Sequence, residues 1–573
     1  MPFPDSGTYP ISKKDLVSFT FDHPDYDLNK PCLISATNPS TDFYTYNTAH
    51  RIVRQLIAGL RASGLEPGDT VCIHSFNSTL YPLLILAIIG AGGLSTGTNP
   101  SYTKSELSHG VRIAKIKFVL AEPEILPNML TALDENGIDV GRKLFVLDTQ
   151  PDQKVPKGRR SWHELLKYGE DDWIRFDDEH RSVDTVVQLY YTSGTTGLPK
   201  CAMTTHQNIV AEHQLFFEAN PRTYPIKLVL AMPFFHVGIA PQVFVSVLKQ
   251  GRETYIMRRF ELEPFLRLHA KHQLTEFFGV PPMVLSIVMS GYCDEKSEKY
   301  RPEYSMRSVR NGTVGAAPCS PDLQARFQRL LAKGCTMGQV WGMTETTSMA
   351  AIVPWGVSRA CGKGELDSAW GTVGVPLPCN RMKLIDEHGK DVTDTGKGEL
   401  CVKGPTVVKG YFENEKATKA SWDDEGYFHT GDVIEVRPHK NPETGREERL
   451  MFVVERLKEL IKVRGFQVAP AELEGALLEH PDITDAAVIG LPTRGQDENE
   501  LPKAFVVRRQ GSKLTEEDVT AHMKERLARY KQLEGGVEFV ESIPKLPSGK
   551  ILKRILREEA KQKLLQQGGV PKL

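Results

Sequence analysis

The chain has 573 residues, of which 40% are hydrophobic and 25% are charged, a composition typical of folded globular proteins. This length exceeds what one hydrophobic core supports and predicts several sub-domains. The 71 basic and 72 acidic residues nearly cancel, so no global field would recruit nucleic acid or an anionic membrane. The nine scattered cysteines form no CxxC pair, which indicates reduced thiols and excludes a disulfide framework or a zinc finger.

Three segments of the sequence bear on targeting and membrane insertion. The first residues lack a basic stretch followed by an apolar one, so we expect no secretory signal. The longest apolar run, Leu83 to Ala91, is too short to cross a bilayer. The last three residues, Pro571-Lys572-Leu573, resemble the Ser-Lys-Leu peroxisomal address except at the first position. A peroxisomal location, through an import receptor, therefore stands beside a cytoplasmic one as an open expectation.

Strand and helix patterns alternate through the first third of the chain. Apolar residues at helical spacing predict a helix over 46–62, and a β-rich run over 70–74 predicts a strand. A buried helix is expected over 81–90, with further strands at 117–120 and 143–147. This alternation predicts an α/β fold with layered, largely parallel sheets.

The second half of the chain has a different sequence pattern. Short strands and Gly/Pro turns from about 371 to 436 predict a β-rich sub-domain, and the charged stretch 437–449 is predicted as an exposed loop. Beyond it, the pattern predicts a small mobile α+β domain: helices over 471–478 and 516–529, and strands over 486–489 and 504–507. We therefore expect a large N-terminal domain, 1–454, and a small C-terminal domain, 455–573.

The most informative segment is a Gly/Ser/Thr-rich loop that follows the predicted strand 186–190. Its glycines allow close backbone approach to an anion, its hydroxyls are donors, and Lys200 adds a cation. The loop lacks the Gly-Lys-Ser/Thr ending of a Walker A motif, but its composition suits a polyphosphate. The expected phosphate-binding residues are Thr192, Ser193, Gly194, Thr195, Thr196, Gly197 and Lys200.

This loop, together with several ordered motifs between about Phe43 and Arg554, resembles the adenylate-forming superfamily of acyl- and aryl-CoA synthetases, peptide-synthetase adenylation domains and luciferases. Among them it is most similar to the 4-coumarate–CoA ligase-like members. The resemblance implies an N-terminal AMP-binding domain, and a C-terminal lid domain that carries the catalytic lysine.

The resemblance assigns the adenine and metal sites to two segments. It implies that Gly315, Ala316 and Ala317 wall the adenine pocket, and small side chains there would let a flat purine lie close to the backbone. The second segment contributes further nucleotide contacts from Gln339, Trp341, Gly342 and Thr344, with Trp341 stacking on adenine in place of the usual tyrosine. Glu345, with Thr196, would hold Mg²⁺, which favours carboxylate and phosphate oxygens.

A third set of motifs concerns the ribose and the small domain. By resemblance, Asp432 would accept hydrogen bonds from the ribose hydroxyls and Arg456 would also contact the ribose. Glu455 occupies the hinge position, where the family usually has Asp or Lys. Gly465 would line the thiol tunnel, and Lys462 and Gln467 would face the active site in one of two domain orientations.

Two further residues, His236 and Lys550, are predicted to act on the acid and the phosphate. His236 resembles the histidine of the acid pocket, which would orient the carboxylate. Lys550 lies in a Pro-Ser-Gly-Lys turn that resembles the family's catalytic-lysine loop. The acid pocket should lie between His236, Val280, Gly315 and the segment 346–349, and Gly238 stands where coumarate ligases commonly carry a tyrosine.

We therefore expect an ATP-dependent acid–thiol ligase. It would activate an aryl or medium-chain carboxylic acid as an acyl-adenylate, with ATP and Mg²⁺, and then pass the acyl group to coenzyme A.

Three other functions fit parts of the sequence. A separate carrier protein could accept the acyl group, and a luciferase-like oxygenase would share the adenylation step. Residues 93–97 match Gly-x-Ser-x-Gly, the nucleophile elbow of serine hydrolases, with Ser95 as nucleophile. That motif requires a strand before the serine, whereas a helix-like run precedes it here, so we expect residues 93–97 to enter a strand. His269 and His272 form HxxH without a third ligand, so no metal is assigned there.

Overall fold

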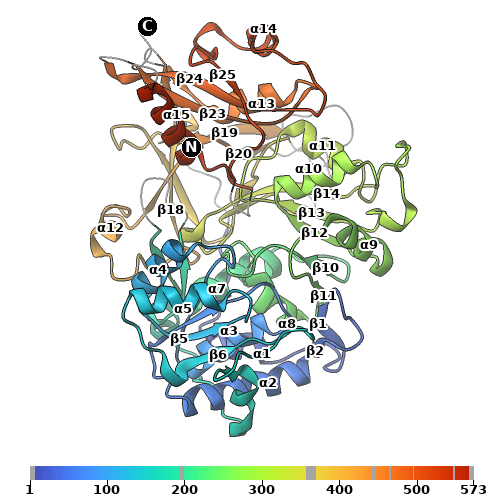
Figure 1. Cartoon of the computed structure of the whole chain (residues 1–573), viewed down its shortest axis with the longest axis vertical. Helices are drawn as coiled ribbons and strands as arrows, with labels where there is room; N and C mark the ends of the chain where they lie inside the picture. Colours follow the sequence, from blue (N-terminus) through green and yellow to red (C-terminus); the bar gives the residue numbers. More distant parts are fainter. Residues whose placement is uncertain are drawn as a thin grey trace.

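The computed structural model describes residues 7–192, 199–239, 241–355, 370–440, 447–457, 459–463, 466–493, 496–545 and 549–566. Its layered sheets and helices form a large N-terminal part and a smaller C-terminal part, which lies at the top of Figure 1. The predicted α/β fold is confirmed. Among the described residues, no helix combines the length and hydropathy needed to cross a membrane.

The largest sheet has seven strands in the order β7-β6-β5-β3-β4-β8-β9, and its neighbours are parallel except for the antiparallel pair β8–β9. Four predicted elements are found almost as expected, at 46–62, 70–74, 81–91 and 116–121. The strands are β7 (Arg160–Ser161), β6 (Leu144–Val146), β5 (Ile116–Ala121), β3 (Thr70–His74), β4 (Leu94–Gly97), β8 (Val186–Tyr191) and β9 (Cys201–Thr205), and the helices that accompany them include α2 (Tyr46–Ala62), α3 (Tyr81–Ala91), α4 (Lys104–Ile113) and α5 (Leu126–Glu135).

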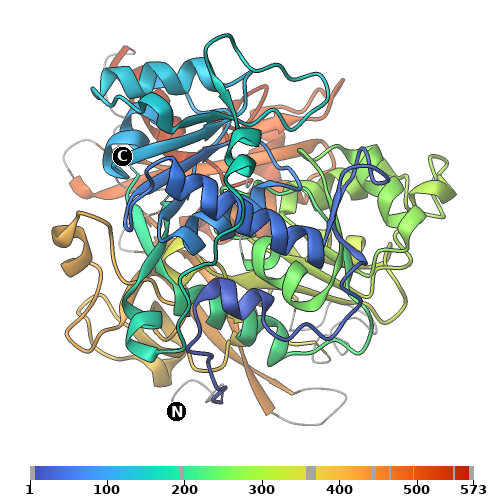
Figure 2. The ribbon, with the colours of Figure 1, turned by 90° about the horizontal axis from the view of Figure 1, so that it is seen from below.

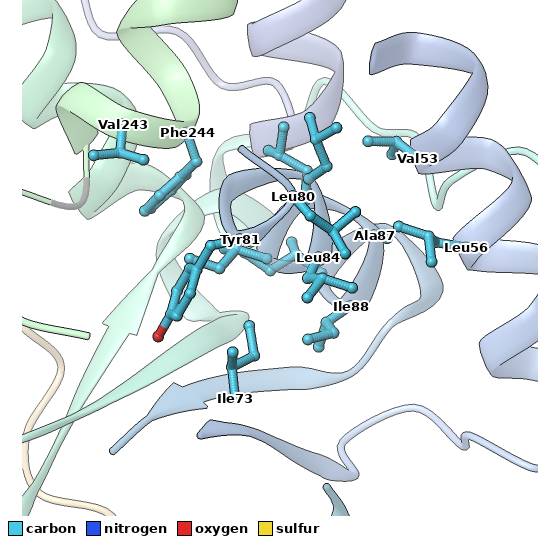
Figure 3. Packing of buried hydrophobic residues seen from close by; sticks show 14 of the residues in the cluster. Val53, Leu56, Ile73, Leu80, Tyr81, Leu84, Ala87, Ile88, Val243 and Phe244 are labelled. Atoms are coloured by element: carbon cyan, nitrogen blue, oxygen red, sulfur yellow. The ribbon is translucent and has the colours of Figure 1, made fainter. Parts of the chain in front are cut away.

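Helix α3 is the centre of the main hydrophobic core. Every one of its residues is buried, and it ends at Gly92, whose φ of 98° favours glycine. Figure 3 shows Leu84 and Ile88 of this helix packed among side chains of α2, β3 and the segment around Phe244. Ser95 lies within β4 and is 1% exposed, so it sits inside a strand, as expected, and not on the exposed turn that a hydrolase elbow requires.

The large part contains two more sheets: β1, β2 and β11 lie beside the seven-stranded sheet, and β12 to β14 lie nearer the C-terminal part (Figure 1). One has the order β10-β11-β1-β2, and the other has the order β12-β13-β14-β15-β16. Their strands are β1 (Pro31–Ser35), β2 (Phe43–Thr45), β10 (Lys227–Leu230), β11 (Glu253–Ile256), β12 (Glu276–Gly279), β13 (Asn311–Val314), β14 (Thr336–Trp341), β15 (Ala351–Ile352) and β16 (Val375–Pro376), and helices α9 (Leu262–His272), α10 (Pro281–Ser290) and α11 (Pro321–Gln328) accompany them. The remaining helices of the large part are α1 (Leu16–Phe21), α6 (Glu179–Asp184), α7 (His206–His213), α8 (Val247–Gln250) and α12 (Glu415–Lys419).

The predicted β-rich sub-domain is an antiparallel sheet of β17 (Arg381–Ile385), β18 (Lys397–Lys403), β19 (Phe428–Lys440) and β20 (Glu447–Arg456). The expected loop at 437–449 is wrong for its described residues, because 437–440 and 447–449 extend these two long strands. In the described residues, β18 pairs with β19 only as far as Glu435, so residues 437–440 of β19 pair with β20 on one side only. Charged residues and proline are tolerated at such an edge of a sheet. There Arg437 lies over the ring of Phe452.

The C-terminal part has its own core between a three-stranded sheet and its helices. The sheet order is β23-β24-β25, with the pair β21–β22 beside it. Strand β20 precedes this part, and helix α15 follows Lys550 in the chain (Figure 1). Seen from below, the large part lies in front of the C-terminal part (Figure 2). The expected helix 516–529 ends earlier, at Arg526, because Leu527 is extended. The elements are β21 (Ile461–Val463), β22 (Phe466–Val468), α13 (Pro470–Leu478), β23 (Ile483–Thr493), β24 (Gln496–Arg508), α14 (Glu516–Arg526), β25 (Val537–Phe539) and α15 (Lys553–Gln566).

Candidate active site

Asp432 is the centre of the first polar group, at the start of the β19–β20 pairing. Its side chain accepts a hydrogen bond from the indole N–H of Trp341 at 2.9 Å and pairs with Nε of Arg456 at 3.0 Å. Arg456 lies opposite Asp432 in the register of the two strands. Trp341 is 5% exposed and packs into the core of the β-rich sheet. The structure thus brings three predicted residues together, and Trp341 orients the carboxylate with its N–H.

Glu345 lies in a short turn after β14, together with Thr344, and is 7% exposed. The hydroxyl of Tyr411 donates to its Oε1 at 2.8 Å, and Nζ of Lys200 lies 4.2 Å from the centre of the Tyr411 ring. Burial raises the pKa of Glu345, whereas Tyr411, Arg456 and Lys200 lower it. A buried carboxylate of this kind is stabilised by an added cation. Tyr411 was not predicted, because a single tyrosine next to a glycine carries no motif signal.

The Gly/Ser/Thr-rich loop begins and ends at residues that hydrogen-bond to one another. The N–H of Thr192 donates to the carbonyl of Lys200 at 2.8 Å, and the N–H of Lys200 donates to Oγ1 of Thr192 at 3.2 Å. The predicted residues Ser193, Gly194, Thr195, Thr196 and Gly197 lie outside the described part of the chain. Two hydrogen bonds therefore join the described ends of the loop, and Lys200 lies beside Tyr411.

The predicted adenine wall follows β13. A Cβ on Gly315 would lie 2.7 Å from a methyl carbon of Val340, and Ala316 has a φ of 70°. Gln339, which is 5% exposed, uses its amide to accept from the N–H and donate to the carbonyl of Cys319. Its side chain therefore holds the turn after Ala317 against β14.

Gly342 is required by a close approach of the backbone. A Cβ there would lie 1.6 Å from the carbonyl oxygen of Ser348, which no side chain could accommodate. The approach brings the buried segment 346–349 back over the end of β14, where the acid pocket was predicted.

His236 lies in the loop after β10. The N–H of Gly238 donates to its Nδ1 at 3.1 Å, so a neutral ring carries its proton on Nε2 and can donate from there. Burial lowers the pKa of His236 to about 4, and the charge of Lys550 adds to this effect. At neutral pH, His236 is therefore an uncharged hydrogen-bond donor.

A cavity of about 150 Å³ lies against Pro233, in the same loop as His236. Its walls are mostly apolar and include Pro233, whose carbonyl accepts the backbone N–H of His236, and Val280, which was predicted to line the acid pocket. Pro282 and Phe260 also contribute. A mostly apolar cavity of this size has room for a group the size of benzene.

Lys550 reaches this region from the C-terminal part. Burial lowers its pKa to about 8, and the charge of Arg456 contributes in the same direction. The carboxylates of Glu459, Asp432 and Glu345 oppose that shift, so Lys550 lies within electrostatic reach of both polar groups described above. The structure thus gathers a lysine from the C-terminal part among carboxylates of the large part.

The turn that carries Lys550 contacts the large part directly. Gly549 has a φ of 83°, and a Cβ there would lie 2.5 Å from Cγ of Pro282, at the wall of the cavity. Lys462, in contrast, is exposed in β21, and its backbone N–H donates to Glu500 at 3.1 Å. In this orientation Lys550, and not Lys462, lies among the predicted site residues. Gly465 and the side chain of Gln467 lie outside what the structure describes.

The HxxH pair, His269 and His272, was assigned no metal on the sequence. Among the residues described, no group of three or more His, Cys, Asp or Glu side chains could hold a metal ion. His269 is fully buried in α9, and Nδ1 of His272 hydrogen-bonds the hydroxyl of Tyr255 at 2.7 Å. His269 stacks at a tilt on Phe265 of the same helix, so both histidines have contacts within the fold.

Comparison with known proteins agrees with this geometry. The model of the AMP-binding enzyme family matches residues 23–412, and that of the AMP-binding enzyme C-terminal domain matches residues 472–550. The phenylacetyl-CoA ligase epaB of Aspergillus niger is 43% identical over 98% of this chain and 100% of its own. A 4-coumarate–CoA ligase of Vanilla planifolia is 34% identical over 95% of this chain and 93% of its own.

Solved structures match over the same span. ATP-bound MatB from Rhodopseudomonas palustris is 27% identical, with a TM-score of 0.79 over 96% of this chain and all of that one. The anthranilate–CoA ligase AuaEII is 20% identical with a TM-score of 0.79 over 97% of this chain and 98% of that one, and this likeness concerns the fold. These matches and the site define an adenylate-forming, AMP-forming ligase. The chain belongs to the AMP-binding enzyme family, among its acyl-CoA ligases.

Proposed function

We propose that this chain joins a compact aryl or medium-chain carboxylic acid to coenzyme A through an acyl-adenylate, with the predicted residues in the roles given below. The observation that carries the proposal is the position of Lys550 within electrostatic reach of Glu345, Asp432 and His236. A cation from one part of the chain thereby meets the carboxylates and the imidazole of the other.

In the first step, a carboxylate oxygen of the acid bonds to the α-phosphorus of ATP, and the bond to the β-phosphate breaks so that pyrophosphate leaves. His236 would donate from Nε2 to the acid and hold it in line, while Lys550 and Lys200 would stabilise the negative charge that develops on the phosphate oxygens. Asp432 would fix the ribose, because the hydrogen bond from Trp341 and the ion pair with Arg456 already orient its carboxylate.

Glu345 fits a magnesium site. Its buried carboxylate is a hard oxygen ligand, and Mg²⁺ in nucleotide sites is typically held by one or two carboxylates plus substrate phosphates. When bound, Mg²⁺ supplies positive charge that neutralises the phosphate oxygens. Tyr411 would keep the carboxylate oriented through its 2.8 Å hydrogen bond.

In the second step, the sulfur of coenzyme A bonds to the acyl carbonyl carbon, AMP leaves, and the thiol proton passes to solvent. The resemblance implies that the C-terminal part turns at Glu455 between the steps, which withdraws Lys550 and exposes a path for the thiol. Lys462 and Gln467 would then approach the site in its place.

The cavity against Pro233 supports a compact acid. Its volume of about 150 Å³ suits one aromatic ring or a short aliphatic chain. Its walls are mostly apolar, so transfer of an apolar group of the acid from water into the cavity is favourable. Gly238, which stands where coumarate ligases commonly carry a tyrosine, would instead leave room for a bulkier or aliphatic acid, so the panel includes aliphatic acids of two lengths. The name of the Aspergillus niger relative makes phenylacetate the first acid to test.

The test is a panel of acids, comprising phenylacetate, 4-coumarate, hexanoate and octanoate, each incubated with ATP, Mg²⁺ and coenzyme A. We expect AMP, pyrophosphate and the acyl-CoA to form in equal amounts with at least one acid, and with phenylacetate or hexanoate faster than with 4-coumarate. AMP and pyrophosphate formed only when a carrier protein replaces coenzyme A would contradict the acceptor, and failure of every acid to yield AMP would contradict the function.

A further inference from the structure

Lys553, three residues after Lys550, is buried among three carboxylates. Its Nζ lies 3.1 Å from Glu474, 3.6 Å from Glu459 and 3.7 Å from Glu455, and its side chain is 7% exposed. We call these four residues the hinge cluster. A lysine is rarely buried without such partners, because removing an unpaired ammonium from water is costly.

The position of Lys553 makes this arrangement specific. It is the first residue of α15, where the helix dipole places partial positive charge, so the local backbone disfavours a cation there. Burial by itself lowers the pKa of Lys553, but the nearby carboxylates outweigh it and the net direction is upward. The carboxylates therefore keep Lys553 charged and hold the start of the helix that follows the Lys550 turn.

Glu455 connects this cluster to the large part. It belongs to β20 and is paired with Val433 of β19, yet its carboxylate points across the predicted domain boundary. There Oε2 accepts the N–H of Ala471 at 2.9 Å and faces Lys553, while Oε1 accepts the N–H of Arg456 at 2.9 Å. Turning the C-terminal part about residue 455 would move Lys553 and Ala471 together and change their contacts with this side chain.

We propose that Lys553 is a positioning residue: by binding Glu455, it stabilises the domain orientation in which Lys550 lies at the phosphate site. This inference rests on the proposed function, and it assigns Lys553 a role that differs from contact with any substrate. The charges of Glu459 and Glu474 hold Lys553 within the small part, so only its contact with Glu455 would break when the parts turn.

The test compares the two half-reactions in the full-length protein. Adenylation is measured by exchange of labelled pyrophosphate into ATP with the best acid of the panel, and thioester formation by supplying the corresponding acyl-adenylate with coenzyme A. The variants are Lys553→Met and Glu455→Gln, the second of which retains an oxygen that can accept from Ala471. The matched control is Lys503→Met, since Lys503 pairs with Glu538 at 2.9 Å and joins β24 to β25.

We expect Lys553→Met to lower the ratio of adenylation to thioester formation about tenfold, within the usual range of coupling between two conformations. Glu455→Gln should change it in the same direction, and Lys503→Met should leave it unchanged. Hydrogen exchange in the peptide that contains Ala471 should accelerate in Lys553→Met and not in Lys503→Met, because its bond to Glu455 would open more often.

An equal loss of both half-reactions in Lys553→Met and Glu455→Gln would overturn the inference, because it would indicate a general structural role. Faster exchange at Ala471 with an unchanged ratio would overturn it too. If Lys553→Met does not fold, Glu455→Gln decides the question. If the unmodified protein converts no acid, the proposed function fails, and the exchange of Ala471 alone then reports whether the hinge cluster holds the two parts together.

Discussion

The lowered pKa of Lys550 should be visible in the pH dependence of adenylation. With a pKa of about 8, in place of the usual value near 10.5, about nine tenths of Lys550 is charged at pH 7 and about one tenth at pH 9. If the charged form stabilises the phosphate, kcat/KM for ATP should be level below about pH 7 and fall about tenfold per pH unit above about pH 8. This parameter reports the free enzyme, whose site holds no phosphate that would raise the pKa of the lysine.

The assay is pyrophosphate exchange from about pH 6.5 to about pH 9.5, repeated with Lys550→Arg and Lys550→Ala. Arginine stays charged throughout, so that variant should be slower but should not show the alkaline fall. Lys550→Ala should lower adenylation by about two to three orders of magnitude and spare thioester formation from a supplied acyl-adenylate. A level profile in the unmodified protein, or the same fall in Lys550→Arg, would refute the assignment.

Three further substitutions test the site. Trp341→Phe removes the N–H that orients Asp432 and should raise KM for ATP about tenfold or more, since hydrogen bonds to charged groups contribute about 1.5–3 kcal/mol. The matched control is Trp370→Phe, because no described residue accepts a hydrogen bond from the indole of Trp370. His236→Ala should raise KM for the acid. Since burial lowers the pKa of His236 to about 4, the activity of the unmodified protein should not fall as pH drops from about 7 to about 6. A fall that disappears in His236→Ala would contradict the role of His236 as a neutral donor. Glu345→Gln keeps an acceptor for Tyr411 but loses the charge, and should raise the Mg²⁺ concentration needed for half-maximal rate about tenfold; an unchanged requirement would place the metal elsewhere.

The first third of the chain follows local rules closely, and so the sequence predicts it well. The helix at 46–62 and the strand at 70–74 have the expected bounds because apolar spacing and a capping threonine at 45 agree. Residues 437–440 and 447–449 were mispredicted because their charges resemble those of a loop, whereas pairing between the two strands determines their conformation.

The role of a single residue could be predicted where the residue belongs to a motif. Its hydrogen-bond and ion-pair partners could not be predicted. Trp341, Asp432 and Arg456 were each expected near the nucleotide, yet no local pattern shows that an indole N–H from β14 would fix a carboxylate 91 residues later. The contact between Glu455 and Lys553 is equally invisible in sequence, because a lysine after a basic motif usually lies in solvent. Such pairs depend on the tertiary packing of separate elements.

The contact between Gly549 and Pro282 also bears on turnover. A pyrrolidine ring has no polar atoms to engage, and the glycine presents only bare backbone, so these two surfaces can separate without breaking a hydrogen bond between them. Packing of Gly549 on the Pro282 ring would position Lys550 through shape alone and would separate at little cost. If the C-terminal part turns between the two steps as proposed, this contact would form and separate once per product molecule, and the lack of a hydrogen bond to the ring would favour fast separation.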